Sequence, residues 1–162
     1  MDITTCSLLY KTYIRPVFEF AGPVWYPIYQ YDGDLLESVQ RFATRLPYGY
    51  LRPDYPTRLK IFSLPIVEDR RLRGDLIVTY RALRGHFGVD LSHMFPLNIN
   101  NALRGHNFKL AKEVFRTTSR QKFLPNRVFS VWNSLPVEVV NASSVNSFKN
   151  RYDDWCALIS RQ

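Results

Sequence analysis

The sequence predicts a mainly helical protein. Apolar residues recur at helical spacing over most of the chain, and its 46% hydrophobic and 22% charged residues are typical of a folded domain. With 162 residues the chain is long enough for one ordinary domain or two very small ones. We therefore expect a helical bundle followed by a smaller helical C-terminal part, with a short strand or an extended basic arm.

Two helices are expected in the N-terminal part. The first covers residues 3 to 20, and Pro16 must kink or divide it, because proline removes an amide donor and clashes with the preceding turn. The second covers residues 34 to 46 and has Glu37 and Gln40 on its polar face. Its apolar face consists of Leu35, Leu36, Val39, Phe42, Ala43 and Leu46.

A third helix should begin near Pro65, which suits a first helical turn, and stop at Gly85. Three of its arginines are open either to pairing within the helix or to phosphate contact, and we favour pairing. Its charged outer face consists of Glu68, Asp69, Arg70, Arg71, Arg73 and Asp75.

Two more helices are expected towards the C-terminal end. One runs from about Phe123 to Ser134, where Pro136 stops it. The other is the most regular of all, because apolar residues from Val145 to Ile159 repeat at intervals of three and four, and Ser144 is a suitable N-cap.

Helical periodicity fails between residues 96 and 118. Phe108, Leu110 and Val114 alternate with polar residues, which favours a short strand or an extended arm. The expected organisation is residues 1–64, 65–98 and 99–162, or a single domain throughout. If there is a seam, we place it around residues 98 to 102.

The positive charge of the chain is concentrated in one region. Of a net charge of +8, residues 101 to 136 carry +6, from seven basic residues and one acidic residue, Glu113. This basic segment is either a solvated surface or a strip that binds nucleic-acid phosphates, with Phe108 and Phe115 stacking on exposed bases. Its cations are Arg104, Lys109, Lys112, Arg116, Arg120, Lys122 and Arg127.

Residue patterns for catalysis are sparse. Asp153 and Asp154 fit a solvated helix face, and Asp69 and Asp75 fit ion pairs within an arginine-rich helix. Nucleophile elbows, phosphate-cradling glycine loops and zinc-ligand spacings are missing from the sequence. We therefore expect a binding protein without catalytic residues, metal, cofactor or small-molecule substrate. Because the sequence has no long apolar run and no secretory leader, we also expect an intracellular, soluble protein.

Four segments, read in order, resemble one family. They are LYKTYIRPVFEFAGPVWYP from Leu9, LLESVQRFATRL, LPIVEDRRLRGDL, and a closing section that contains NRVFSVWNSLPVEVVNASSVNSFKNRYDDW. Together they are similar to the region after the polymerase palm in the non-LTR (LINE-type, jockey-like) retrotransposon reverse transcriptases. The matching positions include Tyr10, Arg15, Pro16, Glu19, Trp25, Glu37, Gln40, Arg41, Arg45, Glu68, Arg70, Arg71, Arg73 and Asp75.

The resemblance covers residues 8 to 155 and departs from the family pattern at Phe20, Gly22 and Pro125. It implies a fragment of an RNA-directed DNA polymerase that lacks the palm aspartates and has no polymerase activity of its own. Residues 1–64 would be a helical thumb, and the remainder an extension that binds template-primer, element RNA or target DNA. It also implies a nuclear location during target-primed integration.

Two other readings stay open. The chain could be a protein-interaction module whose apolar face over residues 34 to 46 packs on the polymerase palm of the parent protein. It could also be a non-functional remnant of an element. In the first alternative the partner is a protein domain, whereas the main reading expects RNA or DNA as the partner.

Overall fold

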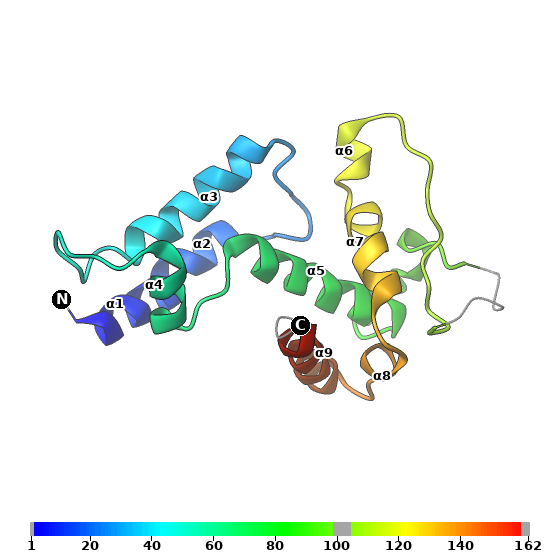
Figure 1. The fold of residues 1–162 in the computed structure, drawn as a ribbon. Coiled ribbons are helices and arrows are strands. Elements are labelled where there is room, and N and C mark those ends of the chain that lie inside the picture. Colours follow the sequence, from blue (N-terminus) through cyan, green and yellow to red (C-terminus); the bar gives the residue numbers. More distant parts are fainter. Residues whose placement is uncertain (1, 99–104, 160–162) are drawn as a thin grey trace. The chain divides into compact units, whose positions relative to one another are not determined.

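The computed structural model describes residues 2–98 and 105–159, and this part of the chain is mainly helical, as predicted. It divides into two compact units, Met1–Arg73 and Gly74–Gln162, called here unit 1 and unit 2. The division falls inside a helix, α5 (Figure 1), whereas the sequence favoured a seam around residues 98 to 102.

The first helical stretch of unit 1 is divided at Pro16, as expected. A π-helical turn, η1, separates two α-helices, and the Arg15 amide donates across it to the Tyr10 carbonyl five residues earlier. Pro16 lies in the first turn of the second helix, where its missing amide is tolerated. The elements are α1 (Ile3–Leu9), η1 (Tyr10–Ile14) and α2 (Arg15–Glu19).

The remaining helices of unit 1 are α3 (Gln30–Ala43) and α4 (Tyr55–Phe62). The short α4 was not predicted, although Pro56 fits its first turn. The α3 helix was expected, but its predicted apolar face is only partly correct, because Ala43 is buried whereas most of the other residues of that face are exposed. The Phe42 side chain is 62% exposed, whereas Gln40 on the predicted polar face is 1% exposed.

The hydrophobic core of unit 1 is small. It is formed by one residue from each of α1, η1, α3 and α4 and one from the turn after α4: Cys6, Tyr10, Ala43, Phe62 and Leu64. Ser63 adopts a left-handed conformation at the end of α4, with φ of 50°. The turn brings the Leu64 amide to the Leu59 carbonyl at 2.9 Å, so that α4 ends against the core.

The long helix α5 (Val67–Leu83) begins and ends close to its predicted limits. It is terminated by Gly85, whose φ of 68° is readily adopted by glycine, and the His86 amide reaches the Arg81 carbonyl at 2.8 Å. The prediction that its charges form an outer face is wrong for two residues, since Arg71 and Asp75 are buried.

Unit 2 contains the other two predicted helices, α7 (Leu124–Ser134) and α9 (Val145–Ile159). Ser144 caps α9 as predicted, because its hydroxyl oxygen accepts from the Ser147 amide at 3.1 Å. Three short elements were not predicted: η2 (Ser92–Met94), α6 (Thr118–Gln121) and α8 (Val137–Val140).

Aromatic rings form the core of unit 2. Trp132 and Phe148 are fully buried, and the Phe148 ring stacks on Tyr80 with 4.5 Å between centroids. The Tyr80 hydroxyl donates to the Ala142 carbonyl at 2.7 Å, which joins α5 to the turn before α9. The Tyr80 ring thus takes part in the apolar packing of this core, while its hydroxyl provides a hydrogen bond to a backbone carbonyl there.

The predicted extended arm pairs with another loop. Leu110 and Leu97 form an antiparallel bridge, in which the Asn98 amide donates to the Lys109 carbonyl and the Ala111 amide to the Pro96 carbonyl. The bridge does not extend into a strand within residues 2–98 and 105–159. None of the helices in these ranges has the length and apolar character needed to cross a membrane.

Candidate nucleic-acid interface

Side chains of α7 hold the backbone of the basic segment. The Trp132 indole donates to the Phe108 carbonyl at 2.7 Å. The Asn133 amide accepts from the Leu110 N–H at 2.9 Å and donates to the Leu110 carbonyl at 3.0 Å. The Asn133 side chain therefore pairs with both backbone groups of Leu110, as a neighbouring β-strand would do. It holds this stretch extended although no sheet is formed there.

His106 forms a third attachment to α7. Its ring is buried, lies edge-on to the Trp132 ring, and brings Nε2 within 3.1 Å of the Trp132 carbonyl. Because a carbonyl oxygen can only accept, Nε2 carries the proton and donates. Burial lowers the pKa of His106 below its ordinary value, since the charged ring would lose its hydration. His106 is a structural residue in its neutral form.

The predicted cations of the basic segment differ in accessibility. Lys112 and Arg116 are exposed, and Lys109 and Lys122 are half-buried. Arg104 lies outside the described residues. Lys112 and Arg116 follow the attached stretch in the chain, in the connection that leads to α6.

Arg120 is also exposed, and it contacts an acidic and an aromatic residue. Its Nε and Nη2 donate to the same carboxylate oxygen of Glu113, at 3.1 and 2.7 Å. Its guanidinium lies 4.9 Å from the centroid of the Phe123 ring. The hydrogen bonds to Glu113 from Arg120 and from Asn126 lower the pKa of that carboxyl, so Glu113 is ionised at neutral pH.

Arg127 is placed differently from the other cations. Its guanidinium forms a two-pronged ion pair with Asp75 of α5, at 2.7 and 2.8 Å, and its Nη1 donates to the Lys122 carbonyl. Only 8% of the Arg127 side chain and 2% of the Asp75 side chain are exposed. Arg127 therefore joins α7 to α5 in the interior and is not positioned to meet a phosphate.

The two aromatic residues predicted to stack on bases are both half-buried. The Phe108 ring already has a cation on it, since the Arg84 guanidinium lies 4.4 Å from its centroid. Arg84 also donates to the Val140 carbonyl at 3.0 Å, which ties it to the end of α8. Phe108 therefore packs against a fixed guanidinium on one face.

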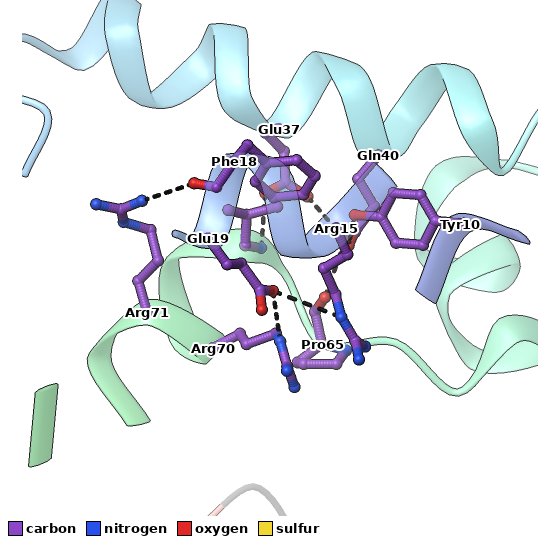
Figure 2. Close-up of polar contacts among 10 residues, drawn as sticks. Tyr10, Arg15, Phe18, Glu19, Glu37, Gln40, Pro65, Arg70 and Arg71 are labelled. Carbon is purple, nitrogen blue, oxygen red and sulfur yellow. Dashed lines mark hydrogen bonds and ion pairs between the residues drawn. The ribbon is translucent and has the colours of Figure 1, made fainter. Parts of the chain in front are cut away.

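The motif residues of unit 1 contact one another (Figure 2). The Tyr10 hydroxyl donates to Gln40 Oε1 at 2.7 Å, and Gln40 Nε2 donates to the Pro65 carbonyl at 2.9 Å and to the Tyr55 hydroxyl at 3.1 Å. The Tyr55 hydroxyl in turn donates to Glu37. Burial raises the pKa of both tyrosines, so each hydroxyl remains a donor. We call this set the Gln40 network.

A second group of motif residues is centred on Glu19 and Arg71. The Glu19 carboxylate accepts from Arg70 and lies 3.7 Å from Arg15 Nε, as Figure 2 shows. Arg71 donates to the Trp25 carbonyl at 2.7 Å, and its guanidinium lies 4.1 Å from the centroid of the Trp25 ring. The motif residues Tyr10, Glu19 and Gln40 thus have structural contacts within unit 1.

Unit 1 also exposes many large apolar side chains. They come from η1 and α2, from α3, and from the loops that follow these helices, and several are more than half exposed. When exposed apolar side chains form a contiguous patch larger than a few hundred Å², the patch commonly marks an interaction surface. The set includes Tyr13, Val17, Phe20, Val24, Leu35, Val39, Phe42 and Leu46.

Comparisons with known proteins add no family assignment. No protein-family model, curated protein or solved structure gives a significant match to the chain. Within the described ranges, no three His, Cys, Asp or Glu side chains are grouped so that they could hold a metal ion.

Proposed function

We propose that the chain is a non-catalytic, nucleic-acid-binding part of a LINE-type reverse transcriptase, and that its basic segment contacts the phosphates. The observation that carries the proposal is the attachment of this segment to α7 through Trp132 and Asn133, followed directly by the exposed Lys112 and Arg116. A fixed backbone lowers the entropic cost of presenting cations to a polyanion. The resemblance of the four sequence motifs supplies the choice of family.

Binding would draw on counterion release. A protein that neutralises several phosphates displaces condensed cations, so the logarithm of its affinity falls linearly with the logarithm of salt concentration. The candidate contacts are Lys109, Lys112, Arg116 and Lys122, whereas Arg120 is already paired with Glu113. Template-primer, element RNA and target DNA all carry phosphate charges, and the proposal includes all three as ligands.

A charge-reversal experiment tests the location of the contact. The double variant Lys112→Glu/Arg116→Glu should weaken binding to a structured RNA by at least tenfold at 50 mM salt. The slope of log affinity against log salt concentration should also become shallower by the amount that about two phosphate contacts contribute. The control is Arg52→Glu/Lys60→Glu, which changes the net charge equally at exposed positions of unit 1. Equal losses in both variants would show that net charge, and not the basic segment, governs binding.

A second candidate function is favoured by the exposed apolar residues of unit 1. In this proposal the chain is an interaction module, and the apolar surface over η1, α2 and α3 packs against the polymerase palm of the parent protein. The predicted apolar face of residues 34 to 46 would then be covered by a partner rather than by the chain itself.

The two candidates respond to different substitutions. Val17→Ser/Phe20→Ser should prevent co-purification with a co-expressed palm domain and leave RNA binding intact. Lys112→Glu/Arg116→Glu should do the reverse. If the serine variant co-purifies with the palm as well as the unmodified chain does, the interaction proposal fails.

A further inference from the structure

The contacts of Glu113 bring together donors that suit an oxyanion. Arg120 Nε and Nη2 both point to Glu113 Oε1, and Asn126 Nδ2 donates to Glu113 Oε2 at 3.0 Å. Three N–H donors from two side chains thus converge on one carboxylate. A phosphodiester also offers two unesterified oxygens that carry one negative charge, and guanidinium groups bind such oxygens through two N–H donors.

The two donor residues are held in place by local structure. The Arg120 amide donates to the Thr117 hydroxyl, which caps α6, and the Arg120 carbonyl accepts from Asn126 Nδ2 at 2.8 Å. Asn126 lies in the first turn of α7, and the Phe123 ring supports the guanidinium. The Asn126 amide therefore links the backbone at Arg120 to the bound carboxylate, and the donors do not depend on Glu113 alone for their arrangement.

We infer that Arg120 and Asn126 form a phosphate subsite, which the Glu113 carboxylate fills in the unbound protein and vacates when nucleic acid binds. The inference rests on the proposed function and assigns Asn126 a role in binding. The Glu113 side chain is 34% exposed and that of Arg120 is 49% exposed, so a backbone phosphate can reach both from solvent. Exposed ion pairs of this kind are weak and are screened by salt, so the exchange of one oxyanion for another is inexpensive.

The carboxylate would then act as a competitor built into the interface. Replacing Glu113 with Gln keeps an oxygen acceptor for Arg120 but removes the charge that opposes a phosphate. RNA affinity should rise about twofold to fivefold, the range expected for an exposed ion pair. One further phosphate contact should make the salt slope steeper by about 0.7 to 0.9.

The test compares four variants by fluorescence anisotropy with a labelled single-stranded RNA across a salt series. Glu113→Gln should bind more tightly than Glu138→Gln, which makes the same change of charge at an exposed position on α8. Asn126→Ala in the Glu113→Gln background should cancel most of the gain, and Asn126→Ala alone should bind more weakly than the unmodified chain. Equal gains for Glu113→Gln and Glu138→Gln would overturn the subsite.

Carbon-detected NMR of the Glu113 carboxyl provides a second readout. Its pKa, lowered by Arg120 and Asn126, should rise when RNA displaces it and brings phosphate nearby. An unchanged titration at saturating RNA would also overturn the inference. If Lys112→Glu/Arg116→Glu weakens binding but these Glu113 measurements show no effect, the subsite fails alone; if the unmodified chain does not bind RNA, the proposed function fails with it.

Discussion

The Asp75 carboxylate receives two hydrogen bonds from the Arg127 guanidinium inside unit 2, at 2.7 and 2.8 Å. The pair lies between α5 and α7, and both side chains are almost entirely buried. Removing one member takes these two hydrogen bonds and the opposite charge away from the other buried group, which costs far more than the pair itself contributes.

Arg127→Ala should therefore lower the free energy of unfolding by about 3 to 5 kcal/mol. The double variant Asp75→Leu/Arg127→Met should recover much of this loss, because neither charge remains buried. Urea denaturation measures both effects. The control is Arg116→Ala, whose exposed side chain should contribute less than about 0.5 kcal/mol. Similar losses for Arg127→Ala and Arg116→Ala would contradict the structural role of the buried pair.

Gln40 should matter more for stability than the apolar residues beside it on α3. Gln40→Ala leaves the buried Tyr10 hydroxyl without its acceptor, and an unsatisfied buried group costs about 1 to 3 kcal/mol. The part-buried bond to the Pro65 carbonyl is lost as well. Phe42→Ala, at a position that is 62% exposed, should cost about 0.5 kcal/mol or less. Thermal melting of both variants decides the matter, and a larger loss for Phe42→Ala would mean that α3 is buried by its apolar face after all.

Acidification should destabilise unit 2 through His106. Because burial lowers its pKa in the folded state, the unfolded chain binds more protons at pH values below its ordinary pKa of about 6.5. Stability therefore rises with pH through this window and falls when the pH is lowered from 7.5 to 5.5. His106→Gln keeps a donor for the Trp132 carbonyl and cannot titrate. Its urea midpoint should change less between these two pH values than that of the unmodified chain.

Asn133 should control the order of the basic segment. Asn133→Ala removes both hydrogen bonds to Leu110, so amide exchange at Leu110 should accelerate by about tenfold or more, since each such bond contributes roughly 0.5 to 1.5 kcal/mol. Ser134→Ala is the matched control, because Ser134 only donates to Val131 within α7. Under the proposed function, Asn133→Ala should also weaken RNA binding while Ser134→Ala leaves it unchanged.

Sequence reasoning located the long helices because their limits are set by local chemistry. Pro16, Gly85 and Ser144 act through their own backbone or hydroxyl groups, and the structure bears out each one. The orientation of α3 is not a local property. Periodicity showed an apolar face but could not show that Gln40 would satisfy the Pro65 carbonyl, which lies 25 residues away. The burial of a glutamine becomes favourable only when its distant partners are known.

The candidate interface was predicted in part. Counting charges found the basic segment, but it could not separate Arg127, which pairs with Asp75 at a distance of 52 residues in the chain, from exposed cations such as Arg116. Asn126 and Asn133 were overlooked because an asparagine carries no charge and little hydropathy signal. Both lie within the NRVFSVWNS stretch of the closing motif, which was the one signal that could have drawn attention to them.

The π-helical turn at η1 sets the phase of the chain between Tyr10 and Glu19. In an uninterrupted α-helix, nine residues advance by about 900°, which would place these two side chains on opposite sides. The wider π-turn takes up about one extra residue without advancing the rotation of the helix. In this arrangement Tyr10 contacts Gln40 and Glu19 contacts Arg70. A regular α-helix of the same length would therefore turn Glu19 by about 100° away from Arg70, whereas a one-residue deletion between residues 10 and 14 would remove the π-turn and keep the present orientation, so the π-turn is what reconciles the spacing of the two motif positions with their contacts.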